Sequence, residues 1–238
     1  MTHVKWAYAI VRVRLQGLTV FGARLYHAIM EIRYPVENDD FQRDDVKVFT
    51  VSQGEVGVSR SGTIDIYTTG FAGCTGVIIT SKEGRGALVA HVSQLGHGIG
   101  RGVADDEEKR QARKKNYLIE ATQGALNLAK NHFADGDALS LALVHGMKSD
   151  PDFADELTTE NPALVHVQDI RADRSRAALL YLDTREKALY LWGTTQDDHF
   201  DKIVSGVEQF EEDPPKCSAQ GTLALVHATN GMSWHLYD

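Results

Sequence analysis

Cys74 and His91 are the residues of this chain whose types and spacing could carry out covalent chemistry. Cys74 lies among small residues, with Gly73 before it and Gly76 shortly after it, and His91 follows seventeen positions later. A nucleophilic cysteine needs a base to take its proton, and small neighbours let a substrate carbonyl approach the sulfur. The sequence therefore predicts a thiol–imidazole pair, provided that the fold brings the two side chains together.

The elements that must position this pair are two strands of a β-hairpin. Two apolar segments, 75–80 and 87–92, are expected to pair, with Ser81 opposite Gly86 and a polar turn of four residues, 82–85, between them. With that even loop length, Cys74 lies opposite Ser93, and His91 stands two residues away on the same face. Diagonal neighbours of this kind are roughly 7 to 8 Å apart. An odd-length loop would instead put the two groups on opposite faces of the sheet.

The stretch from Thr68 to His91 resembles the cysteine-histidine glutamine deamidases. These are the chemotaxis receptor deamidase CheD, the catalytic domain of the cytotoxic necrotizing factors and the Burkholderia lethal factor. In those families a Gly-Cys step enters a strand, a short hairpin follows, and a histidine lies on the return strand. Here the Gly73-Cys74 step, the hairpin, His91 and the threonine six positions before the cysteine match in order and spacing.

The resemblance implies hydrolysis of a protein glutamine side-chain amide to glutamate with release of ammonia. In this role Cys74 is the nucleophile and His91 the base, while Thr68 orients the imidazole through its hydroxyl or its backbone carbonyl. Backbone N–H groups of Gly73, Cys74 and Thr75 are expected to hold the oxyanion. The implied partner is a protein that carries a reactive glutamine, and the chemistry requires no cofactor.

Two other interpretations of the same residues remain open. A cysteine protease or an acyltransferase could use the same dyad, because both proceed through a thioester. A non-catalytic interaction domain could also hold Cys74 and His91 simply as core residues. Cysteine is among the most buried residue types, and a histidine in an apolar strand is often a hydrogen-bonded core residue.

The composition restricts the class of protein. The chain has 238 residues, 42% of them hydrophobic, and can bury a full core. We expect a single deamidase-like domain over residues 1–238, with a C-terminal extension over 200–238 packed on it. The net charge of −8 argues against nucleic acid or an anionic membrane as the main partner, since both require a basic surface.

The location of the protein follows from what the sequence lacks. The N-terminus has no signal-peptide pattern, and no apolar stretch approaches the length of a membrane span. We expect a cytoplasmic site of action, and export without a cleaved signal peptide, as for a bacterial effector or toxin, stays open. Cys74 and Cys217 are the only cysteines in the sequence, so no disulfide framework is expected.

Three apolar segments end in a histidine, at His145, His166 and His227. Three such residues could in principle meet at a zinc ion. Their separations are unequal, and no closely spaced ligand pair accompanies them, so apolar strands that end in half-buried histidines are the simpler interpretation. No metal site is expected.

The pattern along the chain predicts an α+β fold with a mixed or antiparallel, sandwich-like sheet core flanked by helices. Apolar residues recur at helical spacing over 117–133 and 200–210. Residues 25–35 fit either a strand or a helix. Strands, hairpins included, are expected over residues 4–13, 46–51, 55–59, 63–67, 139–145, 164–170, 177–192 and 221–237.

Overall fold

The computed structural model describes residues 30–33, 47–70, 74–82, 84–93, 107–133, 138–145, 164–171, 178–193, 215–226 and 231–238. The strand predicted over 4–13 and the helix predicted over 200–210 lie outside these residues, as does most of the ambiguous segment 25–35. The described residues form twelve strands and one helix. Their order is β1 (Glu31–Arg33), β2 (Lys47–Thr50), β3 (Glu55–Ser59), β4 (Ile64–Thr69), β5 (Cys74–Ser81), β6 (Ala87–Ser93), α1 (Glu107–His132), β7 (Leu139–His145), β8 (Leu164–Arg171), β9 (Ala178–Asp183), β10 (Ala188–Gly193), β11 (Cys217–Leu223) and β12 (Met232–Tyr237).

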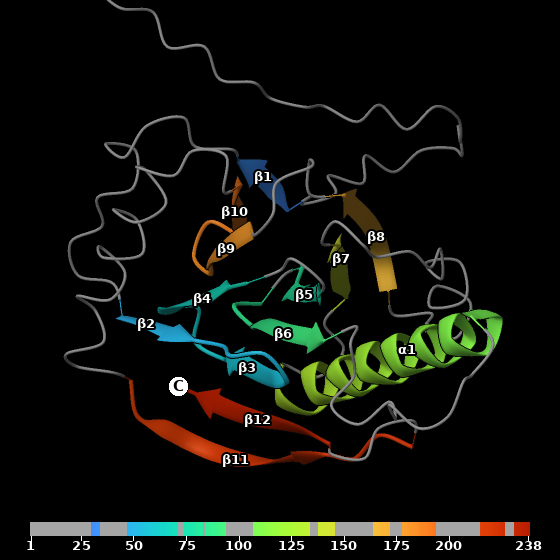
Figure 1. Cartoon of the computed structure of the whole chain (residues 1–238). Helices are drawn as coiled ribbons and strands as arrows, with labels where there is room; N and C mark the ends of the chain where they lie inside the picture. Colours follow the sequence, from blue (N-terminus) through green and yellow to red (C-terminus); the bar gives the residue numbers. More distant parts are fainter. Residues whose placement is uncertain are drawn as a thin grey trace, which may run out of the picture.

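Two mixed β-sheets make up the core (Figure 1). The five-stranded sheet has the order β1-β10-β9-β4-β2, and the seven-stranded sheet has the order β11-β12-β3-β6-β5-β7-β8. Four strand pairs are parallel, namely β1 with β10, β2 with β4, β3 with β12 and β7 with β8. The predicted α+β class with a mixed sheet core is therefore confirmed.

An apolar layer joins the two sheets face to face. Because side chains alternate along a strand, every second residue of each facing strand points into this layer. β4 contributes Ile64 and Ile66, while β5 contributes Cys74 and Ile78. The layer is completed by residues such as Ala87, Val89, Leu180, Leu182 and Leu189.

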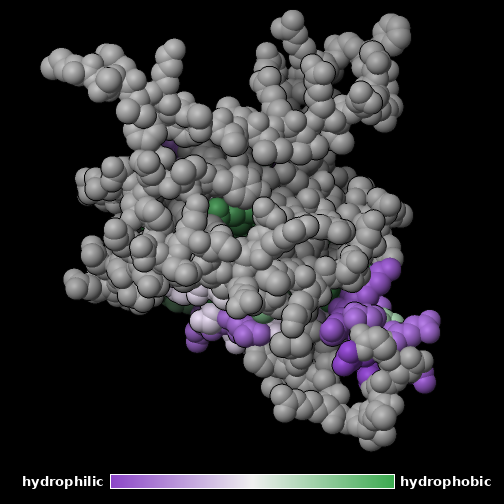
Figure 2. Space-filling view, turned by 45° about the horizontal axis from the view of Figure 1, so that its top comes forward, coloured by the Kyte–Doolittle hydropathy of each residue, from purple (hydrophilic) through white to green (hydrophobic). Residues whose placement is uncertain are grey.

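Helix α1 covers the opposite face of the seven-stranded sheet (Figure 1). It begins ten residues earlier than the predicted 117–133, because acidic residues in its first turn and basic residues further along suit the helix dipole. Residues 108–112 are exposed, and hydrophilic side chains gather on one side of the molecule (Figure 2). The apolar stripe is buried as predicted, at Leu118, Ala121, Ala125, Leu128 and Ala129.

The C-terminal strands belong to the seven-stranded sheet. β11 and β12 form the antiparallel pair of strands predicted for the tail, but β11 begins at Cys217, four residues before the predicted range 221–237. β12 also pairs in parallel with β3. β3 in turn pairs with β6, which carries His91. Within the described part of the chain, α1 is the only helix, and it is too polar to cross a membrane.

Candidate active site

The hairpin of β5 and β6 has the register that the loop length predicts. The Ser81 N–H donates a hydrogen bond of 2.8 Å to the Gly86 carbonyl across the four-residue turn. Cys74 then lies opposite Ser93, and His91 lies two residues before Ser93 on the same strand. Cys74 and His91 are therefore diagonal neighbours on one face of the seven-stranded sheet.

Small and β-branched residues make room for the imidazole on this face. The residue directly opposite His91 is Gly76, which has no side chain to compete for the space. The neighbouring pair on the same face, Ile78 and Val89, is completely buried and packs in the layer between the sheets. The local sequence thus supplies a stiff strand pair with a gap at the position of His91.

Thr68 reaches His91 from the other sheet. It follows Ile64 and Ile66 at the alternate positions of β4, so its side chain points into the layer between the sheets. Thr68 Oγ1 lies 2.8 Å from His91 Nδ1, and both residues are buried, with 0% and 2% of their surface exposed. The structure therefore brings these two predicted residues together, through the threonine hydroxyl.

Burial controls the protonation of His91. It lowers the pKa of His91 from 6.5 to about 4, while a hydrogen bond to the Val51 backbone acts in the opposite direction. The imidazole is therefore neutral near pH 7 and able to accept a proton. Burial also raises the pKa of Tyr117 on α1, and the nearby Cys74 raises it further, so this phenol keeps its proton.

The two cysteines are in opposite environments, and neither forms a disulfide. Cys74 is 4% exposed and belongs to the apolar layer between the sheets. Cys217 is exposed on β11, where its Sγ lies 3.0 Å from the Ala219 carbonyl and 4.0 Å from His235 Nδ1. A reagent in solution therefore meets Cys217 before it meets Cys74.

The predicted backbone donors for an oxyanion are only partly described. Gly73 lies outside the described residues, and Cys74 is the first residue of β5. Thr75 lies in β5 between β6 and β7, opposite Val92 on one side and His145 on the other. Because the N–H groups of a central strand point toward its neighbours, the Thr75 N–H is directed into the sheet. The role of these three groups stays a prediction.

The connection between β2 and β3 covers the end of β6 that carries the site. The Gly54 N–H donates to the His91 carbonyl at 2.8 Å, and Gln53 Nε2 donates to Ser93 Oγ at 2.6 Å. The sequence places Ser93 opposite Cys74, but its local pattern gives no signal for Gln53. Only the antiparallel pairing of β3 with β6 could have indicated Gln53, because that pairing brings Gln53 to Ser93, forty positions later in the chain.

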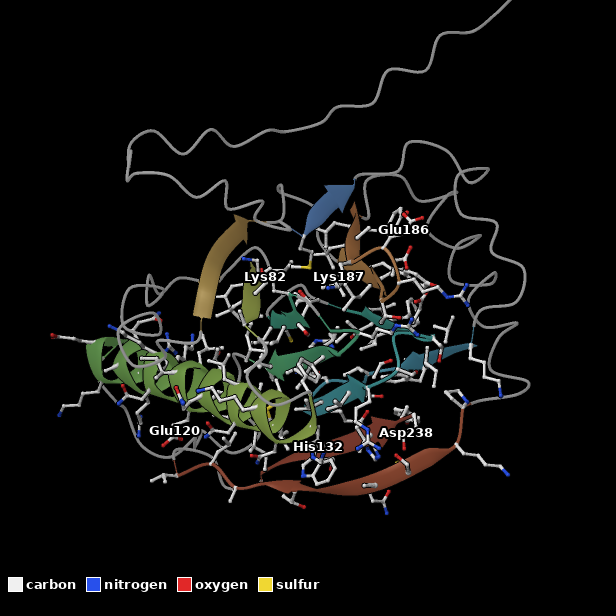
Figure 3. All side chains as sticks on the ribbon, turned by 180° about the vertical axis from the view of Figure 1, so that it is seen from behind. Lys82, Glu120, His132, Glu186, Lys187 and Asp238 are labelled. Carbon is white, nitrogen blue, oxygen red and sulfur yellow. The ribbon has the colours of Figure 1, made fainter. Side chains whose placement is uncertain are left out.

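A cleft of about 440 Å³ lies at the other end of the hairpin. Its lining includes Arg60, Arg85 and His132, and it begins at the turn that follows β5. Lys187, from the turn between β9 and β10, contacts the same hairpin turn: its Nζ donates to the Ser81 carbonyl at 2.7 Å and to the Lys82 carbonyl at 2.9 Å. Figure 3 labels Lys82, His132 and Lys187. The whole length of β5 separates this cleft from Cys74, so the cleft is not part of the thiol site.

The strand-terminal histidines are described only in part. His145 ends β7 and His166 lies near the start of β8, and the register sets His166 opposite Ser140, five residues from His145. His227 lies outside the described residues. Among the residues that the structure describes, no group of three or more His, Cys, Asp or Glu side chains could hold a metal ion.

Comparisons with known proteins leave the family open. No family model and no curated protein sequence matches the chain. Among solved structures, the chain is similar to the crystal structure of the Neisseria meningitidis protein NMB0706, described under the family model DUF152. The match is 10% identical with a TM-score of 0.30, and it covers 52% of this chain and 63% of that one. That family differs from the cysteine-histidine glutamine deamidases, so the match does not confirm the resemblance.

Proposed function

We propose that this chain is a cysteine-dependent amidohydrolase that converts a glutamine side chain of a protein to glutamate and releases ammonia. The observation that carries the proposal is the hydrogen bond of 2.8 Å between Thr68 Oγ1 and His91 Nδ1. It crosses from one sheet to the other and holds the imidazole on the face that carries Cys74. A nucleophile, a base and a group that orients the base thus come from three different strands.

The proposed reaction begins with proton transfer from the Cys74 thiol to His91. In this step His91 is the tautomer whose Nδ1–H donates to Thr68 Oγ1, so Nε2 is the nitrogen that takes the thiol proton. The thiolate attacks the carboxamide carbon, a C–S bond forms and the π electron pair moves onto oxygen. Collapse of this intermediate breaks the C–N bond, and the His91 imidazolium protonates the leaving ammonia.

The second half of the reaction releases the acid. Water attacks the thioester while neutral His91 takes its proton, and the C–S bond breaks to give glutamate and the free thiol. A pKa of about 4 keeps His91 neutral at the start of both halves. The choice of glutamine as substrate rests on the resemblance of the segment from Thr68 to His91. A protease or an acyltransferase would form the same thioester from another acyl group.

Mass spectrometry of candidate proteins after incubation with this chain tests the proposal. We expect a gain of about one dalton at a glutamine, which is the change from amide to acid that thiol catalysis produces. Cys74→Ser and His91→Ala should each abolish the gain, because a nucleophile and its base act as a unit. Cys217→Ala is the matched control and should retain it. A gain that persists in Cys74→Ser would refute the proposal, and backbone cleavage or acyl transfer would indicate the other enzyme classes.

The burial of Cys74 favours a second candidate, a non-catalytic domain in which this thiol is only a core residue. Cys74 is 4% exposed within an apolar cluster. The Cys217→Ala background separates the two candidates, since only Cys74 can then react. A catalytic thiol should label with iodoacetamide near neutral pH in the folded protein, whereas a core thiol should label no faster than the protein unfolds. Labelling limited by unfolding would favour the core role.

A further inference from the structure

Ser93 and Gln53 form a polar pair beside Cys74 that takes no part in the acid–base steps. Ser93 is the residue directly opposite Cys74 in the antiparallel pair of β5 and β6. Directly opposite residues point to the same face of the sheet, with Cβ atoms about 4.5–5.5 Å apart. Cys74 is 4% exposed and Ser93 2% exposed, so both side chains of this opposite pair are buried.

Gln53 fixes the direction of this hydroxyl. Its Nε2 donates to Ser93 Oγ at 2.6 Å, which uses a lone pair of the serine oxygen. An amide N–H group can only donate, so the Ser93 O–H hydrogen must point to another acceptor. Gln53 itself sits on an anchored turn, because the next residue, Gly54, donates its N–H to the His91 carbonyl at 2.8 Å.

We infer that the Ser93 hydroxyl is a side-chain donor to the oxyanion that forms above Cys74, and that Gln53 is the residue that positions it. The inference rests on the proposed function and adds a catalytic residue to it. As the C–S bond forms, the π electron pair of the carboxamide moves onto oxygen, and the Ser93 O–H donates a hydrogen bond to that oxygen. Ser93 keeps its proton, and the hydrogen bond weakens when ammonia leaves and the carbonyl returns.

The sheet explains why a side chain takes this role. The Thr75 N–H is directed into the sheet between β6 and β7, so it cannot turn toward the thiol face. Ser93 lies on that face. Its oxygen accepts from Gln53, so the hydrogen of the Ser93 hydroxyl remains available to donate. In a buried site a single such donor to an oxyanion is worth roughly a hundredfold to a thousandfold in turnover.

Two reagents for Cys74 separate oxyanion stabilisation from thiol reactivity. A short peptide that carries an aldehyde in place of the glutamine carboxamide adds the thiol reversibly and places an oxygen where the oxyanion forms. Methyl methanethiosulfonate has no carbonyl and reports only the reactivity of the thiol. All variants are made in the Cys217→Ala background, so that both reagents report on Cys74 alone.

The expected result is a loss of aldehyde affinity without a loss of thiol reactivity. Ser93→Ala should weaken aldehyde binding roughly tenfold to a hundredfold, and Gln53→Ala roughly threefold to tenfold, because a positioning residue acts through its partner. Rates with methyl methanethiosulfonate should stay within about twofold of the parent. Ser93→Thr, which keeps the hydroxyl, should retain most of the affinity. Ser52→Ala, next to Gln53 on the same turn, is the matched control and should change nothing.

Two different failures can be told apart. Unchanged aldehyde affinity in Ser93→Ala would overturn the role of Ser93 and leave the proposed function standing. Parallel losses with both reagents would show that Ser93 acts on the thiol or on the fold, and would also overturn it. A parent protein whose Cys74 reacts with neither reagent would refute the proposed function, and the inference with it.

Discussion

Thr68 and Asp65 lie three residues apart on opposite faces of β4, and each belongs to a buried polar cluster. On the inner face, Thr68 Oγ1 contacts His91 Nδ1 at 2.8 Å beside Cys74. On the outer face, Asp65 accepts hydrogen bonds from Tyr181 and Thr184. The distances are 2.5 Å from the Tyr181 hydroxyl, 2.9 Å from the Thr184 N–H and 3.0 Å from the Thr184 hydroxyl.

The two clusters differ in whether their members could transfer a proton to one another. The Asp65 cluster, made of Asp65, Tyr181 and Thr184, holds one acceptor group surrounded by donors, and it ties β4 to the end of β9. Burial raises the pKa of Asp65, and the hydrogen bonds from Tyr181 and Thr184 oppose that rise. The thiol site, made of Cys74, His91 and Thr68, instead sets an imidazole and a thiol on one face of a sheet, and under the proposed function these are the base and the nucleophile. Burial and a shifted pKa mark both clusters, so the partners decide which one is suited to chemistry.

Replacement of Asp65 by alanine should produce the largest stability effect and no effect on the thiol. It leaves the Tyr181 hydroxyl and the Thr184 N–H in a buried position without the Asp65 carboxylate, while the Thr184 hydroxyl keeps a second acceptor, the Ile64 carbonyl at 3.1 Å. We expect the free energy of unfolding to fall by roughly 3 to 5 kcal/mol, measured by denaturant titration. Well below the melting temperature, the reaction of Cys74 with methyl methanethiosulfonate should be unchanged.

Tyr181→Phe is the matched control for this prediction. It removes only one of the three hydrogen bonds and keeps the aromatic ring, so the loss of stability should be roughly 1 to 2 kcal/mol. A fall in Cys74 reactivity in Asp65→Ala, measured while the protein remains folded, would contradict the comparison. It would show that the two faces of β4 are coupled.

The parts of the structure that the sequence predicts are local. The pairing of Cys74 with Ser93 follows from a four-residue turn, and the buried stripe of α1 follows from helical spacing. Contacts between distant strands leave no such local signal. The bond from Tyr181 to Asp65 joins residues 116 positions apart, and the bond from Gln53 to Ser93 joins residues 40 positions apart.

Thr68 shows where a resemblance adds to local pattern. Spacing alone gives no reason to bring Thr68 to His91, since the bond depends on how the two sheets stack. The resemblance to the deamidases named Thr68 but left open whether its hydroxyl or its carbonyl is used. The structure answers with the hydroxyl, while the catalytic role of the residue stays a prediction.

The lowered pKa of His91 predicts a pH dependence of stability. Below pH 6.5 the unfolded chain binds a proton at this residue, whereas the folded protein does not until about pH 4. The contribution of His91 is therefore complete above pH 6.5 and is lost as the pH falls toward 4. The loss should reach about 3 kcal/mol, measured as the free energy of unfolding over this range.

His91→Gln is the control for this titration, because glutamine can still form a hydrogen bond with Thr68 but does not titrate. Its stability should fall less steeply than that of the parent as the pH decreases from 6.5 to about 4. Identical slopes in the two proteins would mean that His91 is not held in its neutral form by burial. A pKa shifted by burial would then distinguish Asp65 alone, and would no longer be common to the two clusters.

Thr68→Val leaves most of the structure untouched and is the change that most directly separates the two faces of β4. Valine keeps the shape of threonine but removes the hydroxyl that lies 2.8 Å from His91 Nδ1. If that bond orients the base, turnover of the amide substrate should fall roughly tenfold to a thousandfold, because the imidazole loses its preferred tautomer and direction. Thr68→Ser, which retains the hydroxyl, should recover most of the activity. A variant Thr68→Val with unchanged turnover and lowered stability would place Thr68 in the same structural class as Asp65, and His91 would then be oriented by another group, such as the Val51 backbone.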